Sequence, residues 1–571
     1  MTLSITTVGL LCAIFALVQY ISRSKRKSLK FLRGPPSPSW LLGNEYDLSH
    51  QFEVGKLEDP WVEEYGTIFK FAGCFGEEFL HISDPKALQH ILHASSYHYP
   101  KTDDVRKATR RIFGRAIVWA EGETHQRHRK ALNPAFSASQ LKTFLSLFQR
   151  SIERFSDKWQ AEFFSSFPST SGTPSEWKQI NIYRWLPRIT LDVIGESAFD
   201  YRFGALDATS DTTINDDKKG DLGSTIRHLF DDSTAISKWS MFLRAVRRGL
   251  WWDPTFQNPF NPDSPLILTR EDRRFNSWLE ASKVAARDIL NKKSQESGQE
   301  EDKDILSILV RSNHLTDPHK RLDDEEVLSQ MGTIILAGHE TTASTTTWML
   351  YELARHPEDQ RRVREEIQEV WKRKREAGED VDEGLNSNDY DSMEFFNAVL
   401  KETLRLYPIV IALFRCSDRD DVIPLDEPII SASGEKLKEI PVGKGQRVHI
   451  NITGYNKLKS VWGPDAHTWN PERFLDMKKG TTLGVYANLL TFSAGVRSCI
   501  GWRFALLEMQ VILAGLLERY EFMIQDPEME IYRAQAGFMV PIVRGKETDG
   551  PQMPLGVRRL KESSMEGQTD V

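Results

Sequence analysis

Residues 492–501, Phe-Ser-Ala-Gly-Val-Arg-Ser-Cys-Ile-Gly, constrain the fold of this chain more than any other segment. A long apolar run that is typical of a buried helix follows them directly. A cysteine just before a helix has its thiolate favoured by the helix dipole and by free backbone N–H groups. Gly495 and Gly501 would let the backbone approach a flat ligand, and Arg497 supplies a cation for an anionic group on it. The segment therefore predicts a ligand-bearing thiolate at Cys499.

A second segment places an acid and an alcohol side by side in an apolar helix, at Glu340 and Thr341. Neither group belongs in a dry interior without partners. A carboxylate that takes protons from solvent, beside a hydroxyl, is suited to a proton relay. The alternative is a hydroxyl that bonds back to the preceding helical turn. His339 and Glu340 also begin a zinc-protease pattern, but Ala343 stands where the second histidine is needed, so that interpretation fails.

Charged pairs at helical spacing are a third feature. Glu402 and Arg405 are three residues apart and share a helix face. Such a pair is normally a solvated contact worth under about 1 kcal/mol. His125 and Arg129, four residues apart, share a face in the same way. For His125 a plain surface histidine remains the alternative.

Taken together and in this order, the motifs resemble those of the cytochrome P-450 family. That family's heme-binding signature, Phe-x-x-Gly-x-Arg-x-Cys-x-Gly, is matched at all five fixed positions: Phe492, Gly495, Arg497, Cys499 and Gly501. The resemblance implies a heme b whose iron has Cys499 as its axial thiolate and whose propionate pairs with Arg497. Thiolate pushes electron density onto iron and favours cleavage of the O–O bond.

The same resemblance extends to the acid and alcohol segment. The family's central helix carries Ala-Gly-x-Glu/Asp-Thr, which this chain matches with Ala337, Gly338, Glu340 and Thr341. The match implies that Ala337 and Gly338 lie against the heme, and that Gly338 leaves room for oxygen. It also implies that Glu340 and Thr341 are the catalytic proton relay.

Structural and heme-binding cations follow from the resemblance as well. It implies that Glu402, Arg405 and Arg473 form a buried triad that braces the heme segment. His125 and Arg129 resemble the family's Trp-x-x-x-Arg helix, with His125 in place of tryptophan, and this departure puts its bond to the heme in doubt. Arg415 matches a propionate-binding position.

The N-terminus predicts a membrane anchor. No charged side chain occurs from Thr2 to Ser22, about the length that a helix needs to cross a bilayer. A basic cluster follows, which the positive-inside rule keeps in the cytosol. A cleaved secretory signal would carry its positive charge before the apolar run instead. We therefore expect a single-pass anchor in the endoplasmic reticulum membrane with a cytosolic catalytic domain.

Composition excludes some functions and partners. The net charge of −7 gives no indication of nucleic acid binding. The four cysteines are Cys12, Cys74, Cys416 and Cys499, and their spacing forms neither a disulfide framework nor a C-x-x-C zinc pair. The chain also lacks a flavin fingerprint and iron–sulfur cysteines. The two electrons that a heme-thiolate monooxygenase needs must therefore come from a separate NADPH-dependent reductase.

The resemblance implies a monooxygenase that inserts one oxygen atom from O2 into a hydrophobic small molecule. A terpenoid, sterol or fatty-acid-like substrate is expected, with a place in secondary metabolism. Six apolar residues would line its pocket, although core packing explains each equally well: Ile112, Phe113, Ile409, Val410, Leu413 and Phe538. The alternatives are a heme-thiolate isomerase or dehydratase that needs no O2, and a tethered binding protein without a catalytic cycle.

The expected architecture is mainly α with a small β region, a cytochrome P-450 fold preceded by one transmembrane helix. Residues 1–33 would be the anchor and basic flank, 34–545 the catalytic domain, and 546–571 a polar tail. Strands are predicted near residues 67–71 and 78–82, and helices over 137–160, 267–292, 323–355, 393–406 and 502–517. Aromatic and basic residues at 236–252 suggest a second contact with membrane lipid, through Trp251 and Trp252.

Overall fold

The computed structural model describes residues 28–164, 177–207, 270–296, 303–314, 320–475 and 483–560, with short pieces at 316–317 and between 229 and 265. Most of the predicted anchor, residues 1–27, lies outside the described residues, as do Trp251 and Trp252. Among the helices that the structure does describe, none combines the length and apolar character needed to span a bilayer. The anchor and the second lipid contact therefore stay predictions.

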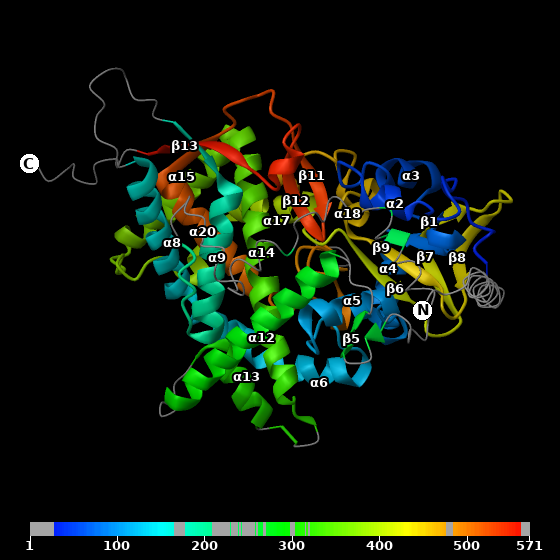
Figure 1. Ribbon diagram of the computed structural model, residues 1–571. Helices are drawn as coiled ribbons and strands as arrows, with labels where there is room; N and C mark the ends of the chain where they lie inside the picture. Colours follow the sequence, from blue (N-terminus) through cyan, green and yellow to red (C-terminus); the bar gives the residue numbers. More distant parts are fainter. Residues whose placement is uncertain are drawn as a thin grey trace, which may run out of the picture.

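Helices make up most of the described chain, as the sequence predicts (Figure 1). The longer helices are α5 (Asp103–Phe113), α6 (Gly122–Leu132), α8 (Leu145–Trp159), α9 (Ile182–Phe199), α12 (Arg270–Glu296), α13 (Ile305–His314), α14 (Asp324–Arg355), α15 (Pro357–Glu376), α17 (Glu394–Leu406) and α20 (Trp502–Arg519). Shorter ones are α2 (Glu45–Ser49), α3 (Glu58–Tyr65), α4 (Pro85–Gln89), α7 (Ala138–Lys142), α16 (Ser387–Ser392), α18 (Ile452–Asn456) and α19 (Lys459–Trp462). Short 3₁₀- or π-helical segments are η1 (Cys74–Gly76), η2 (His90–Ala94), η3 (Ser96–His98), η4 (Asn133–Phe136), η5 (Gln160–Phe164), η8 (Pro471–Phe474), η9 (Gly495–Arg497) and η10 (Glu547–Asp549).

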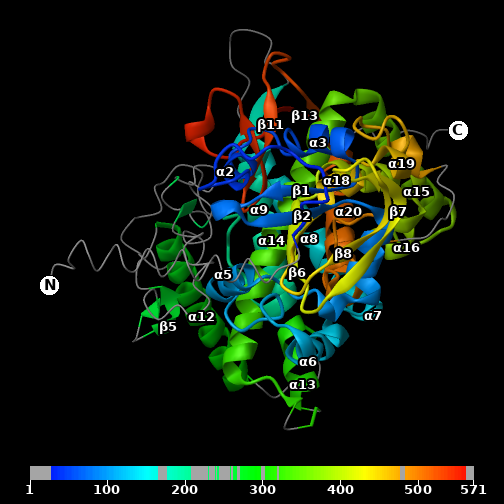
Figure 2. The ribbon, with the colours of Figure 1, turned by 90° about the vertical axis from the view of Figure 1, so that its right-hand side faces the viewer.

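The strands form small sheets. The largest has the order β1-β2-β9-β6, from β1 (Ile68–Ala72), β2 (Glu78–Ile82), β9 (Arg447–Asn451) and β6 (Ala412–Cys416). Figure 1 shows this sheet at the right of the molecule, away from α8, α9 and α15, and Figure 2 views the molecule from that side. The others join β10 (Tyr520–Met523), β13 (Pro554–Arg559) and β3 (Lys178–Asn181); β11 (Ile531–Ala536) and β12 (Phe538–Val543); β7 (Asp421–Ile430) and β8 (Lys436–Val442); and β4 (Gln257–Asn258) and β5 (Asn261–Pro265).

The central helix is α14, which packs against α9, α12, α17 and α20. It starts at a capping box: Asp323 accepts from the backbone N–H of Glu326 at 2.8 Å, and Glu326 accepts from that of Asp323 at 3.1 Å. Helices that cover it on several sides account for its near-continuous burial over 32 residues. This packing fixes the faces that α14 presents to the site.

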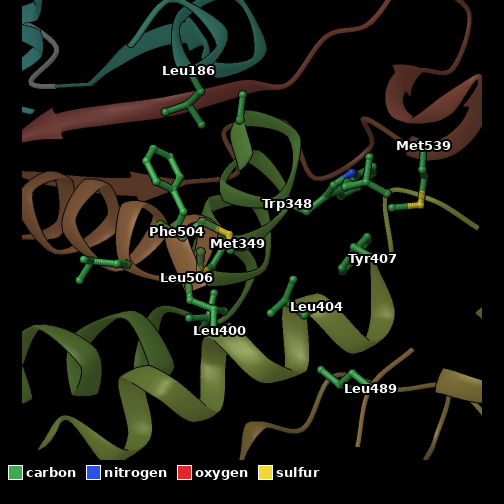
Figure 3. Packing of buried hydrophobic residues seen from close by; sticks show 14 of the residues in the cluster. Leu186, Trp348, Met349, Leu400, Leu404, Tyr407, Leu489, Phe504, Leu506 and Met539 are labelled. Atoms are coloured by element: carbon green, nitrogen blue, oxygen red, sulfur yellow. The ribbon is translucent and has the colours of Figure 1, made fainter. Parts of the chain in front are cut away.

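Interlocked aromatic and aliphatic side chains fill the interior between α14, α17 and α20 (Figure 3). Trp348 on α14 stacks on Tyr407 with ring centroids 4.5 Å apart. Phe504 and Leu404 bring α20 and α17 into the same core. Each such buried side chain stabilises the fold by roughly 1.5–3 kcal/mol. The core thus holds the helices that carry the site rigidly together.

The packed body extends past both predicted domain boundaries, at residues 33 and 545. Leu29 and Leu32, assigned to the anchor flank, are buried in the core. Residues 554–559, assigned to a polar tail, form β13 between β10 and β3, with Leu555 and Val557 fully buried. The strand was missed because prolines and glycines surround its short apolar alternation, and such residues usually indicate loops.

Candidate functional site

A cavity of about 1580 Å³ lies between α5, α6, α14, β6 and the cysteine segment. It brings together most of the residues that the sequence singled out: Ile112, Phe113, His125, Arg129, Ala337, Gly338, Thr341, Ile409, Val410, Leu413, Arg415, Phe492, Arg497, Cys499, Gly501 and Phe538. Glu340, Gly495, Glu402, Arg405 and Arg473 do not line it. All six expected substrate contacts are therefore at the cavity wall.

Cys499 presents its sulfur to this cavity from the loop before α20. Its backbone N–H donates to the Phe492 carbonyl at 2.8 Å, which closes the loop. Burial by the surrounding protein raises the pKa of the Cys499 thiol, while the Gly501 N–H and the Arg129 charge act to lower it. A metal ion bound at the sulfur would lower the pKa of the thiol further and stabilise the thiolate.

Gly495 is needed for a contact with protein rather than with a ligand. Its φ is +65°, and a Cβ there would lie 1.8 Å from the Leu92 carbonyl oxygen of η2. The cysteine loop therefore rests directly on the backbone of η2. The sequence suggested that Gly495 makes room for a flat ligand, but in this structure the neighbour at its α-carbon is η2.

We expect Gly495→Ala to lower stability far more than Gly434→Ala. Both glycines have positive φ, but nothing lies within 4 Å of a Cβ at Gly434. Gly434→Ala, the control, should lower the free energy of unfolding by about 1–2 kcal/mol, the usual penalty for a side chain on left-handed backbone. Gly495→Ala adds a clash with backbone that cannot move aside. Urea midpoints of the two variants measure the difference, and equal midpoints would contradict the packing described here.

Cationic side chains gather at one end of the cavity. Arg129, Arg415, Arg497 and Lys101 line it, and Glu121 is the carboxylate that pairs with Lys101 (2.9 Å) and with Arg497. Four cations against one carboxylate leave a surplus of three positive charges. Arg497 Nε is also buried without a hydrogen-bond partner within the described chain. A buried surplus of this kind calls for an anionic ligand.

The pKa shifts in this cluster reflect burial and the close approach of its charges. Burial, then the neighbouring Arg497, lowers the pKa of Arg415 to about 10. Burial also lowers the pKa of Lys101, to about 8, although Glu121 opposes the shift. Burial alone would raise the pKa of Glu121, but Lys101 and Arg497 outweigh it and the pKa falls to about 2. The carboxylate is therefore charged at neutral pH and holds the cations in place.

His125 is buried beside this cluster, so the surface-histidine alternative fails. Its Nδ1 lies 3.2 Å from the Tyr97 hydroxyl. Burial first, then the charges of Arg497, Lys101 and Arg129, lower the pKa of His125 to about 4. The imidazole is thus neutral at pH 7 and offers a hydrogen bond without adding charge.

Sequence reasoning missed Lys101, Glu121 and Tyr97. Arg497 connects them, because it binds Glu121 and the Ser96 carbonyl and lies over the Tyr97 ring, with its guanidinium carbon 4.9 Å from the centroid. These partners lie 376 to 401 residues earlier in the chain. No local spacing could have indicated them.

Several α14 residues line the cavity, among them Ala337, Gly338 and Thr341. The Thr341 hydroxyl donates back to the Ala337 carbonyl at 2.7 Å, which is the alternative raised by the sequence. Glu340 points elsewhere and accepts a hydrogen bond from the Tyr183 hydroxyl at 2.6 Å. An added Cβ at Gly338 would lie 2.8 Å from the Ile194 side chain, so this glycine also lets α14 approach α9. The proton relay stays a prediction.

The structure places Glu402, Arg405 and Arg473 in one network. Arg405 donates to both carboxylate oxygens of Glu402 at 2.7 Å, and neither side chain has any exposed surface. Arg473 Nε donates to Glu402 at 3.2 Å. The surface-contact alternative therefore fails for Glu402 and Arg405.

The network reaches the cysteine loop through Asn456. Arg405 donates to the Asn456 carbonyl at 2.9 Å. The Asn456 side chain in turn accepts from the Leu490 N–H at 3.0 Å and donates to the Thr491 hydroxyl at 2.9 Å. Thr491 directly precedes Phe492, so the triad supports the start of the loop that carries Cys499.

These residues fit the heme that the resemblance implies. Within the described chain, no three His, Cys, Asp or Glu side chains form a metal site, so a metal at Cys499 must bring its other ligands with it, as porphyrin iron does. The surplus of positive charge suits the two propionates of a heme. Apolar walls beyond them suit a macrocycle and a hydrophobic substrate.

Comparisons with known proteins agree with this site. The sequence model of the family named Cytochrome P450 matches residues 33–546. Cytochrome P450 monooxygenase 128 of Postia placenta is 32% identical, over 93% of this chain and 93% of its own length. Cytochrome P450 monooxygenase claQ of Ampulloclitocybe clavipes is 31% identical, again over 93% of each chain. The chain therefore belongs to the cytochrome P450 family of heme-thiolate enzymes.

Proposed function

We propose that this protein is a monooxygenase that inserts one oxygen atom from O2 into a hydrophobic small molecule. The observation that carries the proposal is a single cavity with the Cys499 sulfur at one wall, Thr341 at another and apolar side chains around them. A heme b bound there supplies the activation of O2, and a thiolate ligand favours O–O cleavage.

The chain's own residues have three tasks in this proposal. Arg129, Arg415, Arg497 and Lys101 hold the two propionates, and neutral His125 adds a hydrogen bond. Thr341 lines the cavity, and Glu340 on the same helix would supply protons to the Thr341 side. The apolar wall excludes water and orients the substrate.

The substrate that suits this wall is terpenoid-, sterol- or fatty-acid-like. Its contacts come from three parts of the chain that the fold brings together: Ile112 and Phe113 on α5, Ile409, Val410 and Leu413 before and on β6, and Phe538 on β12. The Met539 N–H donates to the Ile409 carbonyl at 2.9 Å, which fixes the hairpin beside that segment. We place the reaction in secondary metabolism, a proposal supported by similarity to fungal monooxygenases.

Electrons come from NADPH through a separate reductase, because the sequence contains no flavin or iron–sulfur motif of its own. We further propose that the chain before Leu29 anchors the protein in the endoplasmic reticulum membrane with the body in the cytosol. The uncharged run from Thr2 to Ser22 supports this. So do the large apolar side chains of Trp40 and Phe52, 68% and 62% exposed near the start of the described chain.

The test is oxygen labelling. We expect purified protein with reductase, NADPH and 18O2 to convert a member of a terpenoid, sterol and fatty-acid panel into a product that carries one 18O atom. Reductase-free and NADPH-free reactions are the controls. Conversion that proceeds without O2, to an isomer or a dehydrated product, would instead establish the isomerase or dehydratase alternative.

A further inference from the structure

The carboxylate of Glu340 is held by one phenol. The Tyr183 hydroxyl on α9 donates to Glu340 Oε1 at 2.6 Å, and no other side chain within the described chain donates to this carboxylate. His339 Nε2 lies 3.6 Å from Oε2, beyond hydrogen-bond distance. Burial, followed by the Glu340 charge, raises the pKa of Tyr183 well above its ordinary value, so the phenol keeps its proton.

Tyr183 is itself fixed by its surroundings. Its partly buried side chain packs against the small apolar cluster of Ala534 on β11 and Val540 and Ile542 on β12. The start of α9 is held by β3, whose Asn181 Oδ1 accepts from the Met553 N–H at 2.9 Å. The phenol therefore has little freedom to follow a moving carboxylate, and any motion between the two must come from Glu340.

In this orientation the Glu340 carboxylate does not face the cavity, so it is not placed to pass a proton directly to the Thr341 side. Neighbouring residues on a helix point about 100° apart, and here Thr341 lines the cavity while Glu340 does not. The Glu340 side chain keeps 15% of its surface exposed, so it has access to solvent protons. Glu340 can pass a proton directly to the Thr341 side when its carboxyl group leaves Tyr183 and turns around the helix.

We propose that Tyr183 is a positioning residue that holds Glu340 off the cavity and so controls proton delivery to the Thr341 side of α14. This inference rests on the proposed function. In the step, protonated Glu340 turns and gives its proton to a water beside Thr341. The carboxylate that remains returns to the Tyr183 hydroxyl and takes a new proton from solvent. Tyr183 gives up no proton itself.

The test compares Tyr183→Phe with Tyr532→Phe. Both remove a phenolic hydroxyl beside the same small cluster, but the Tyr532 hydroxyl donates to Glu547 at 3.4 Å and not to Glu340. Two readouts need no substrate: the C–O stretching frequency of the ferrous carbon monoxide complex, and the decay rate of the ferrous dioxygen complex in H2O and D2O. We expect Tyr183→Phe to shift the C–O frequency and to accelerate decay roughly tenfold or more, because a charge-assisted hydrogen bond no longer retains the carboxyl.

Glu340→Gln separates positioning from packing. If Tyr183 acts through the carboxyl group, adding Tyr183→Phe to Glu340→Gln should not accelerate decay of the dioxygen complex further, because an amide is too weak an acid to pass on a proton. The proposal is overturned if Tyr183→Phe behaves like Tyr532→Phe, or if its effect is just as large in the Glu340→Gln background. The wild-type red-shifted carbon monoxide band and 18O incorporation report separately on the proposed function. Their absence would defeat that function, whereas their presence with an inert Tyr183 would defeat this inference alone.

Discussion

Replacing Cys499 with serine is expected to abolish the red-shifted band of the ferrous carbon monoxide complex and all O2-dependent turnover. The band depends on thiolate ligation of the iron, and a serine hydroxyl remains protonated and cannot replace the thiolate. Carbon monoxide difference spectra of the purified variant measure the effect directly. The loss should be complete, because no other sulfur stands on the loop before α20.

The chain offers a matched control for this experiment. Cys416, at the end of β6, lines the same cavity from another wall. Cys416→Ser should leave the band at its wild-type position and intensity. If Cys416→Ser removed the band and Cys499→Ser preserved it, the assignment of the metal ligand would be wrong.

The sequence predicted best what a local pattern determines. The strands at β1 and β2 and the helices α12, α14, α17 and α20 begin and end within a few residues of their expected positions. Each has either strict alternation or helical periodicity, and α14 also has its capping residues in place. The positions of Cys499 and Arg497 at the cavity follow for the same reason, since a ten-residue motif fixes them.

What the sequence could not predict depends on which distant segments meet. Lys101 and Glu121 join Arg497 only because the fold brings α20's loop against the segment before α6. The direction of Glu340 is another case: periodicity places it on α14, but Tyr183 on α9 decides where its carboxylate lies. The tertiary partner, which no local pattern names, determines the role of such residues.

Glu402→Leu is expected to destabilise the protein by about 3–5 kcal/mol, the usual cost of removing one partner of a buried ion pair. The substitution leaves the Arg405 guanidinium with no exposed surface and no carboxylate, and it also removes a partner of Arg473. Carbonyls of Asn456 and Thr468 remain, but they cannot neutralise the charge. Urea unfolding followed by tryptophan fluorescence measures the loss.

The exposed pair of Arg361 and Glu365 on α15 is the matched control. These side chains, 59% and 55% exposed, are also one helical turn apart, so Glu365→Leu should cost no more than about 0.5 kcal/mol. Equal losses of unfolding free energy for the two variants would contradict a buried, structural role for Glu402.

A structural role for Glu402 also predicts how Glu402→Leu affects heme binding. Since the triad reaches Thr491 through Asn456, Glu402→Leu should lower the fraction of molecules that retain heme. Molecules that still bind heme should keep a normal thiolate band, because Glu402 touches neither Cys499 nor the cavity.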